Sequence, residues 1–448
     1  MLKTAISIVK KFQKAGYEAY FAGGSVRDFL MGKEPKDYDI ATSALPNEIE
    51  SLMEKTYPIG KQFGVILVEE NGHHFEVATF RSDSSSSDGR RPDAVLFTSA
   101  KEDAVRRDFT INGLFYDPVQ EKLLDYVGGQ KDIKNKILRF IGEPHERVKE
   151  DHLRLLRGVR FKNNFGFEYE PGTKRALEEL SHLIDNVSKE RIQDEMTKML
   201  LHPHRAHSMR ELDTFGILER ILPEVTACKG IQQTGQYHHE GDVFTHLLKA
   251  LHDMPENFAS KELVWAVLLH DIAKPETALK KSDRVHFDGH AALSSKMARI
   301  VCKRLKMSND ETAKIAWMIE QHMTVGTIPN MRRAHQVNLF WHPWFEDLMR
   351  LHYCDEHGSF PFDLTLYQTV MKLYDDFKGE KLLEDHFKPK LSGDQLMKLF
   401  KLKPGPLIRE LLQVQREAQI EGLVHDESEA RKFVEGYLSE KGAHGKDI

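Results

Sequence analysis

The pattern of hydrophobic and polar positions changes along this chain. At the start, Leu2, Ile6, Val9 and Phe12 recur at helical spacing between lysines, which predicts an amphipathic helix rather than a signal peptide. The next hydrophobic runs are short and rich in β-branched and aromatic residues, which predicts strands. These runs lie at 17–24, 37–42, 64–70 and 73–80.

From about residue 145 the pattern is helical to the end. Val148, His152, Leu155 and Val159 fall on one face of a predicted helix, with charges elsewhere. We therefore predict an α+β protein with a mixed α/β head and a long helical remainder. Its parts are the head at 1–140, a helical neck at 141–225, a histidine-rich helical body at 226–360 and a helical tail at 361–448.

Composition narrows the class of protein. A chain of 448 residues is too long for one compact core, and no apolar run approaches the roughly 20 residues of a membrane span. The three cysteines form no paired motif, which fits a reducing cytoplasm. The net charge of −5 excludes a protein that is basic throughout. Residues 131–210 carry +4, which suits contact with RNA or ordinary surface unevenness equally well.

A pair of carboxylates marks the predicted head. Asp37 and Asp39 stand two apart on a predicted strand, so both side chains project from the same face. They repel each other unless a cation lies between them. Mg²⁺ takes oxygen ligands and is often shared between carboxylates and substrate phosphates, which is the arrangement of two-metal nucleotidyl transfer. An isolated D-x-D is more often a turn or a solvated edge.

A glycine turn precedes this pair. Gly23 and Gly24 end one predicted strand and open a helix at Ser25. Glycines let the backbone approach phosphate oxygens, and a helix N-terminus supplies N–H donors. Arg27 is placed to reach a triphosphate. Such a turn alone is usually structural, but together with the carboxylate pair it is much more specific.

Three motifs carry a resemblance to a known family. GGSVRD at 23–28, DYDIATSA at 37–44 and RRDFTIN at 106–112 resemble the head of class II nucleotidyltransferases of the polymerase β superfamily, the bacterial CCA-adding enzymes and poly(A) polymerases. The resemblance implies that Asp37 and Asp39 hold catalytic Mg²⁺ ions. The residues that it implies in nucleotide binding are Gly24, Ser25, Arg27, Arg107, Asp108 and Asn112, the last three touching ribose and phosphates.

Two further head features are interpreted with this family. Glu76 is a candidate third acidic metal ligand, although a solvated strand position explains it equally well. The serine-rich loop with DGRRP at 88–92 is similar to a family loop that helps to switch from C to A addition. The resemblance therefore disfavours an enzyme that adds only CC.

The neck carries E-D-x-x-R. Asp151 and Arg154 are three apart, hence neighbours on a predicted helix, and an isolated pattern of this kind is usually a solvated ion pair. In the resembling family these residues are the protein template. An aspartate accepts from the exocyclic amine of C or A, and an arginine donates to ring nitrogen or carbonyl, whereas G and U present the opposite pattern. Glu150 is assigned as orienting support, and Glu190 and Arg191 as structural neck residues.

The body holds an adjacent His-Asp pair with further histidines around it. His246, His270, Asp271 and Asp355 follow the order H…HD…D and resemble the ligands of HD phosphohydrolases, with His290 and His322 between them. Imidazoles and carboxylates suit a divalent metal, whose identity is open. The family's usual glycine is Ala273 here. An inherited fold with a structural metal, or with none, is the alternative.

The resemblance, which covers nearly the whole chain, implies an enzyme that adds CCA to the tRNA 3′ end from CTP and ATP. We expect a cytoplasmic monomer or homodimer that binds no membrane, with a tail that binds tRNA. An A-adding enzyme or a poly(A) polymerase is the first alternative. The second, of another class, is an HD phosphohydrolase whose head only binds nucleotide or RNA.

Overall fold

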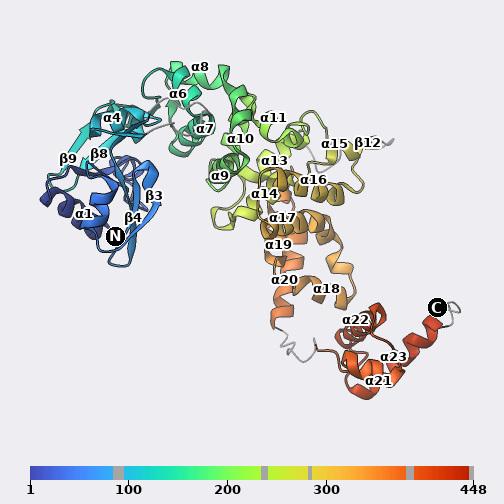
Figure 1. The fold of residues 1–448 in the computed structure, drawn as a ribbon. Coiled ribbons are helices and arrows are strands. Elements are labelled where there is room, and N and C mark those ends of the chain that lie inside the picture. The colour runs from blue at the N-terminus through green and yellow to red at the C-terminus, as the bar shows by residue number, and fades with distance from the viewer. Residues whose placement is uncertain (84–94, 234–240, 281–284, 380–387, 443–448) are drawn as a thin grey trace. The chain divides into compact units, whose positions relative to one another are not determined.

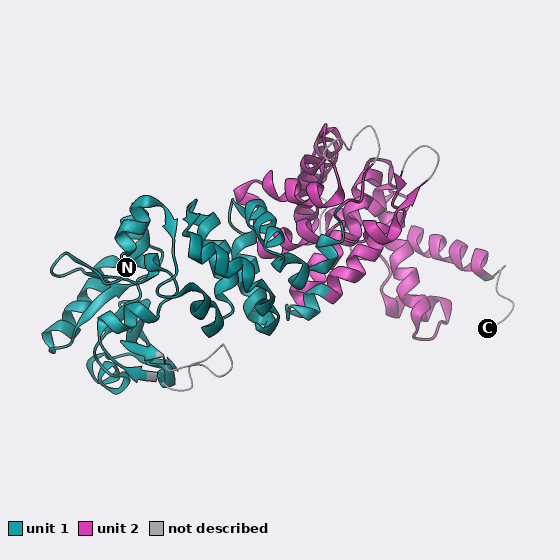
Figure 2. Ribbon diagram, turned by 90° about the horizontal axis from the view of Figure 1, so that it is seen from above, with its two compact units in different colours: residues 1–229, 301–308 teal, residues 230–300, 309–448 magenta. Residues whose placement is uncertain are grey.

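The computed structural model describes residues 1–83, 95–233, 241–280, 285–379 and 388–442 (Figure 1). These residues form two compact units, coloured separately in Figure 2. One comprises residues 1–229 with 301–308, and the other comprises 230–300 with 309–448. The predicted loop with DGRRP at 88–92 lies outside the described residues. The finer division into head, neck, body and tail stays a prediction.

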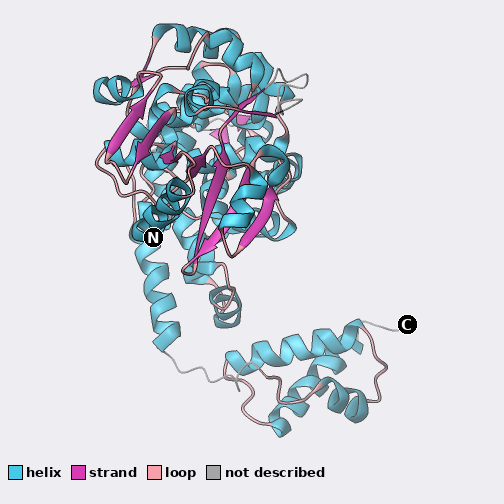
Figure 3. Cartoon of the chain, turned by 60° about the vertical axis from the view of Figure 1, so that its left-hand side comes forward, coloured by secondary structure: helices cyan, strands magenta, loops and turns pink. Residues whose placement is uncertain are grey.

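The first unit contains a mixed seven-stranded sheet with the order β3-β4-β5-β2-β1-β8-β9 (Figure 3). The strands are β1 (Ala19–Ala22), β2 (Ile40–Thr42), β3 (Thr56–Gly60), β4 (Val65–Glu70), β5 (His73–Thr79), β8 (Leu114–Asp117) and β9 (Lys122–Asp125). Only β2 and β5 pair in parallel; the other neighbours are antiparallel. The four predicted strand runs correspond to β1, β2, β4 and β5, and the α+β prediction is confirmed.

The N-terminal helix packs where its pattern predicts. In α1 (Leu2–Lys14), Val9 and Phe12 are fully buried together with Ile8, in one cluster with sheet residues such as Val77. Leu2 stays exposed because it lies at the first position of the helix. Burial of this apolar stripe, at roughly 25 cal/mol per Å², fixes α1 against the sheet.

The remaining elements of the first unit are mostly helical. The head helices are α2 (Gly24–Leu30), α3 (Pro46–Leu52), α4 (Ala100–Arg106) and α5 (Gly129–Asn135). The helices that follow are α6 (Pro144–Glu150), α7 (Arg154–Phe165), α8 (Pro171–Glu179), α9 (Lys189–Leu200), α10 (Arg205–Thr214), α11 (Ile217–Ile221) and α12 (Pro223–Thr226). Two short strand pairs complete the unit, β6 (Arg81–Asp83) with β7 (Val95–Phe97) and β10 (Ile137–Leu138) with β11 (Glu168–Tyr169).

The second unit is almost entirely helical (Figure 3). The helices from residue 243 onward are α13 (Val243–His252), α14 (Lys261–Leu269), α15 (Lys274–Thr277), α16 (His290–Arg304), α17 (Asn309–Gln321), α18 (Arg333–Phe340), α19 (Phe345–Gly358), α20 (Thr365–Gly379), α21 (Gly393–Phe400), α22 (Pro406–Ile420) and α23 (Glu427–Gly442), with a short hairpin of β12 (Leu279–Lys280) and β13 (Val285–His286). The last three helices have a hydrophobic cluster of their own, which includes Leu396, Leu411 and Val434. No helix among the described residues is long and apolar enough to cross a membrane.

Candidate functional site

The glycine turn lies between β1 and α2. Gly23 has a φ of 64°, a left-handed conformation that glycine adopts without steric cost. A Cβ placed there would lie 2.8 Å from Nη1 of Arg107, so any side chain would displace that arginine. The buried Ser25 donates its hydroxyl to the carbonyl of Ala22 at 3.1 Å. The GGSVRD motif therefore packs closely against Arg107 of the RRDFTIN motif.

The two aspartates lie immediately before β2 rather than within it. The prediction of a strand beginning at Asp37 was wrong, because the chain has ladder partners on both sides only from Ile40. Asp39 still accepts the N–H of Ala22 at its carbonyl at 3.0 Å, so it continues the pairing with β1. The pair therefore stands at the end of a central strand, close to the glycine turn.

The sheet register brings a third carboxylate to this pair. Ile40 lies opposite Val77 in the parallel ladder, so the preceding residues, Asp39 and Glu76, are neighbours. Withdrawal of water by surrounding protein, followed by the charges of Asp37 and Glu76, raises the pKa of Asp39 to about 6. Asp39 is solvent-exposed, so a cation can reach its carboxylate from solution. A group of acidic oxygens whose mutual repulsion a cation would relieve is a suitable site for a hard divalent metal.

A chain of hydrogen bonds connects the other predicted nucleotide-binding residues. Arg27 donates to Oδ1 of Asn112 at 2.7 Å, and Asn112 donates to Oδ1 of Asp108 at 2.9 Å. Arg157 donates to Oδ2 of Asp108 at 2.7 Å. Burial would raise the pKa of Asp108, but the charge of Arg157 and the N–H groups of Asn112 and Phe109 hold it well below its usual range. The Asp108 carboxylate is therefore ionised and fixed.

Sequence reasoning missed Arg157. It lies one helical turn after Arg154 on α7 and links that helix to the RRDFTIN segment through Asp108. The signal was present in the sequence as a second arginine at helical spacing, but the pattern did not indicate a partner 49 positions away. Arg107, for its part, forms an ion pair with the buried Asp103 at 3.1 Å, which anchors it beside the glycine turn.

The helix predicted to carry Glu150, Asp151 and Arg154 is broken. Helix α6 ends at Glu150 and α7 begins at Arg154, with Asp151 in extended backbone between them. Oδ1 of Asp151 accepts the N–H of Leu153 at 3.1 Å, a side-chain bond that competes with continuation of a helix. The prediction of one continuous helix through all three residues was therefore wrong.

The two expected base-reading side chains have different partners. Oδ2 of Asp151 accepts Nη2 of Arg191 at 2.8 Å. Arg154 instead donates to Glu150 at 2.8 Å and to the carbonyl of Arg147 at 2.6 Å. Arg154 is thus bonded to Glu150, whereas Asp151 is bonded to Arg191, a residue that was interpreted as purely structural.

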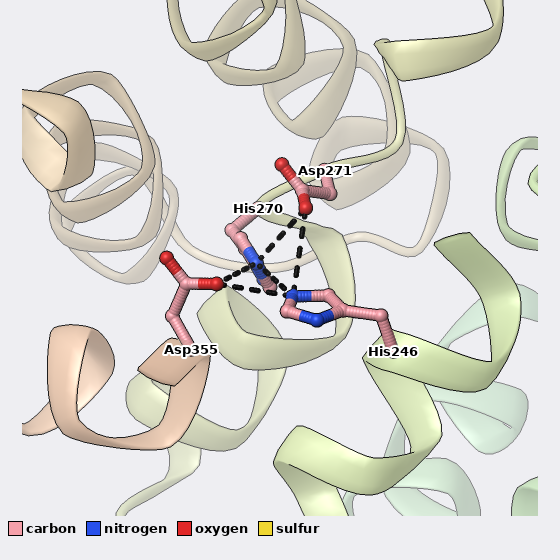
Figure 4. Close-up of side chains that lie close together, drawn as sticks. All are labelled: His246, His270, Asp271 and Asp355. Atoms are coloured by element: carbon pink, nitrogen blue, oxygen red, sulfur yellow. Dashed lines mark hydrogen bonds and ion pairs between the residues drawn. The ribbon is translucent and has the colours of Figure 1, made fainter. Parts of the chain in front are cut away.

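In the second unit, three helices bring the expected H…HD…D residues together (Figure 4). His246 comes from α13, His270 and Asp271 follow α14, and Asp355 comes from α19. One ligand atom from each lies within 4.8 Å of the others. Nε2 of His246 is 3.0 Å from Oδ1 of Asp355, and Nε2 of His270 is 3.3 Å from Oδ2 of Asp271.

A second ligand group shares one of these carboxylates. Asp271, His290 and His322 also place their ligand atoms within 4.8 Å of one another, and all three residues are buried. Oδ1 of Asp271 is 3.3 Å from Nε2 of His290, while its Oδ2 faces the first group. The sequence showed both histidines, but they were left out of the expected ligand set. A carboxylate placed between two groups suits two adjacent metal ions.

The tautomers of three histidines support metal binding. Nδ1 of His270, His290 and His322 lies 2.9, 2.7 and 2.6 Å from a backbone carbonyl, which only accepts hydrogen bonds. Each ring therefore carries a proton on Nδ1, and in its neutral form it directs the lone pair of Nε2 into the cluster, the arrangement typical of metal-ligating histidines. The Nε2 atoms of His290 and His322 are only 3.2 Å apart, which is unfavourable without a cation between them.

The charges of the cluster lead to the same conclusion. Burial would lower the pKa of His270, but Asp271 and Asp355 raise it to about 10. Burial and then the charge of His270 lower the pKa of His322 to about 4. Positive charge is therefore favoured at His270 in the metal-free chain, and a divalent metal would supply it in place of the ring proton.

The backbone at Ala273 explains why the family's usual glycine is not needed at this position. Ala273 has a φ of −92°, which alanine adopts without strain, so no glycine is required there. Its N–H donates to the hydroxyl of Ser294 at 3.1 Å. The next residue, Lys274, is buried and places Nζ 2.5 Å from Oδ2 of Asp271 and 2.6 Å from Oε1 of Gln233.

The chain matches three domain families in sequence. Residues 19–139 match the poly A polymerase head domain, residues 166–229 match the probable RNA and SrmB-binding site of polymerase A, and residues 238–391 match the HD domain. The order is the one that the motifs predict.

Individual relatives cover different shares of the chain. The CCA-adding enzyme of Bacillus pumilus is 46 % identical over 218 residues, 48 % of this chain and 54 % of that protein, so this match spans about half the relative's length. The CCA-adding enzyme of Bacillus cereus is 29 % identical over 97 % of this chain and 98 % of that protein. The crystal structure of the Bacillus stearothermophilus CCA-adding enzyme in complex with CTP shares the fold, with a TM-score of 0.75, 24 % identity and 99 % coverage of both chains.

Proposed function

We propose that this chain, whose parts match the poly A polymerase head domain, the RNA-binding site of polymerase A and the HD domain in sequence, adds CCA to the 3′ end of tRNA from CTP and ATP. The principal support for this proposal is the group of Asp37, Asp39 and Glu76 beside the glycine turn, where withdrawal of water and then the charges of the other two carboxylates raise the pKa of Asp39 to about 6. A site that needs a cation at this position has the chemistry of nucleotidyl transfer.

The carboxylates would hold Mg²⁺, with Asp37 and Asp39 as its main ligands and Glu76 as a third. When bound, Mg²⁺ neutralises triphosphate charge and lowers the pKa of the attacking hydroxyl. The chain itself contributes an anchored Arg107 and the Arg27 guanidinium, which lies over the ring of Phe165 at 4.4 Å. These two cations orient the triphosphate and stabilise the charge that develops on the departing pyrophosphate.

The nucleotide would be selected by fixed side chains. Asp108 and Asn112, held in the hydrogen-bond chain from Arg27 to Arg157, hold the sugar. Asp151 accepts from the exocyclic amine of C or A, and Arg154 donates to the same base edge. Gly24 and Ser25 bring backbone close to the phosphates. Selection then requires no nucleic-acid template.

The test uses purified full chain and tRNA transcripts that end before CCA, after C and after CC. Each is supplied with CTP, ATP or both, and product lengths are measured. We expect each transcript to be completed to CCA and then to stop. Addition of A alone to the transcript ending in CC would establish the A-adding alternative, and a ladder of A residues would establish poly(A) synthesis. No addition with Mg²⁺ present would refute the proposal.

A second activity is supported by the two ligand groups around Asp271. We call these two ligand groups together the HD centre. We propose that it binds divalent metal and hydrolyses phosphate esters, because two ligand groups that share one carboxylate would place two ions side by side. Metal analysis of the purified protein, followed by assays with cyclic and linear phosphodiesters, tests this second function. If only these assays gave turnover, the head would be a nucleotide-binding or RNA-binding domain.

We also propose partners and a cellular compartment for this protein. The partners would be the tRNA 3′ end, CTP and ATP, with a helical tail that contacts the tRNA. The three cysteines are free thiols, which suits the reducing cytoplasm. Size measurement in solution distinguishes the monomer from the homodimer.

A further inference from the structure

The position of Asp151 depends on a residue 40 positions further along the chain. Arg191, in the first turn of α9, donates Nη2 to Oδ2 of Asp151 at 2.8 Å. About a quarter of each side chain is exposed. Since α6 and α7 are separated at Asp151, the short backbone link alone does not orient this carboxylate. The direction of the Asp151 carboxylate is therefore set by the groups that donate hydrogen bonds to it.

Each oxygen of Asp151 has one defined donor. Oδ1 accepts the N–H of Leu153 at 3.1 Å, and Oδ2 accepts Arg191. An ionised carboxylate has about four lone-pair sites, so each oxygen keeps one for a further donor. Two donors from different directions fix the plane of the carboxylate and therefore the direction of the lone pairs that remain.

Arg154 does not supply this constraint. Its guanidinium is used by Glu150 at 2.8 Å and by the carbonyl of Arg147 at 2.6 Å. The side chains of the two residues assigned to the base edge are therefore held by different helices. Arg154 is held by residues of α6, and Asp151 is held by Arg191 of α9. An error in the orientation of Asp151 would not be corrected by Arg154.

We propose that Arg191 is a positioning residue for nucleotide selection, which acts by directing Asp151 toward the exocyclic amine of C or A. This inference rests on the proposed function of Asp151 as a base-reading residue. Without Arg191 the carboxylate rotates about its side-chain torsions and accepts less well from the amine. The selection against U and G weakens, because neither offers an amine at that position.

The test compares Arg191→Ala and Arg191→Lys with the matched control Glu190→Ala, whose side chain is exposed in the same helical turn. The measurements are kcat and KM for single additions of each of the four nucleotides to tRNA transcripts, together with thermal melting. For Arg191→Ala we expect KM for CTP and ATP to rise roughly tenfold, with a similar loss of preference over UTP and GTP, since a partly exposed charge-assisted bond is lost. Lysine should restore part of the selectivity, and Glu190→Ala should behave as the parent protein.

A double variant decides whether Arg191 acts through Asp151. If it does, Asp151→Ala with Arg191→Ala should select no worse than Asp151→Ala alone. Additive losses, or an equal fall in kcat for all four nucleotides with unchanged selectivity, would overturn the inference. A parent protein that itself adds all four nucleotides equally would refute the base-reading role of Asp151, and this inference with it. A selective parent whose preference survives Arg191→Ala would refute the role of Arg191 alone.

Discussion

The head and the HD centre both concentrate acidic groups, but they do so in opposite environments. In the head, Asp37, Asp39 and Glu76 are solvent-exposed near the start of the central strand β2. In the HD centre, His270 and Asp271 are almost fully buried, and histidine rings neutralise part of the charge. An exposed carboxylate group would leave room for a triphosphate and an RNA end, whereas a buried mixed set would bind a metal tightly and admit only a small group.

The two centres also differ in how they are held together. The head carboxylates come from two hydrogen-bonded strands, so backbone register places them. The HD ligands come from separate helices whose packing places them. The head should therefore tolerate changes of ligand without unfolding, whereas metal binding at the HD centre should be coupled to the packing of its helices.

The largest expected effect comes from the head. Asp37→Ala and Asp39→Ala should each lower nucleotide addition by at least about a thousandfold, because several kcal/mol of charge stabilisation is lost. RNA binding should stay largely intact. Addition is followed by product length, and RNA binding by a filter assay. Glu34→Ala, an exposed acidic residue nearby, serves as the control. Unchanged addition in either aspartate variant would remove the metal assignment.

The next effect tests whether the two centres are separate. His270→Ala should abolish metal-dependent hydrolysis and lower the bound metal content, because a ligand of the first group is lost. Nucleotide addition should persist. Metal is quantified by elemental analysis and both activities are assayed on one preparation. His425→Ala, an exposed histidine, should change neither activity. Joint loss of both activities in a protein that still melts cooperatively would mean that the two centres act as one.

A smaller effect concerns base selection by the neck. Arg154→Ala should reduce the preference for CTP and ATP over UTP and GTP by about tenfold or more, since one base contact is worth roughly 1–3 kcal/mol. Competition assays with mixed nucleotides measure this ratio. Arg154 also donates to the carbonyl of Arg147, so thermal melting must accompany the assay. Parent-like discrimination in a stable variant would contradict the protein-template interpretation.

The smallest effect is on stability and depends on pH. The folded-state pKa of Asp39 is raised to about 6 from 3.8, so the folded protein binds this proton more tightly than the unfolded chain. This contribution to stability is present at low pH and is lost as pH rises through about 6. Asp39→Asn should therefore stabilise the metal-free protein at pH 7 by about 1 kcal/mol, after allowance for solvent screening. Melting with and without Mg²⁺ measures it, and the gain should shrink at pH 4.5 and in saturating Mg²⁺. A destabilised variant at pH 7 would show that the carboxylates do not repel one another.

Much of the fold could be predicted from local patterns. The apolar stripe of α1 lies where the helical spacing predicts it, and β1, β4 and β5 lie where the runs of β-branched and aromatic residues predict them. Strands β3, β8 and β9 were not predicted. In β9, Lys122–Asp125, none of the residues is fully buried, so its pattern carries little hydrophobic signal. Edge strands such as β3 and β9 form because a neighbouring strand offers hydrogen bonds, which the periodicity of the sequence does not show.

The candidate sites were predictable to the extent that their ligands are close in sequence or in a familiar order. Asp37 with Asp39, and His270 with Asp271, were visible as pairs. Glu76 could only be placed by the parallel register of β2 and β5. His290 and His322 became candidate ligands once their rings were found beside Asp271. A charge interacts with what is close in space, and distance in sequence does not give that.

By itself, the sequence determined which chemical groups are present and the order in which they occur: a carboxylate pair after a glycine turn, E-D-x-x-R, and H…HD…D. Only the tertiary structure decided their partners. Asp151 bonds to Arg191 rather than lying in one helix with Arg154, and Asp271 divides its two oxygens between two ligand groups. The physical reason is that a hydrogen bond extends about 3 Å and an ion pair little more. Such contacts therefore depend on how helices and strands pack, and local propensity fixes those elements without fixing their packing.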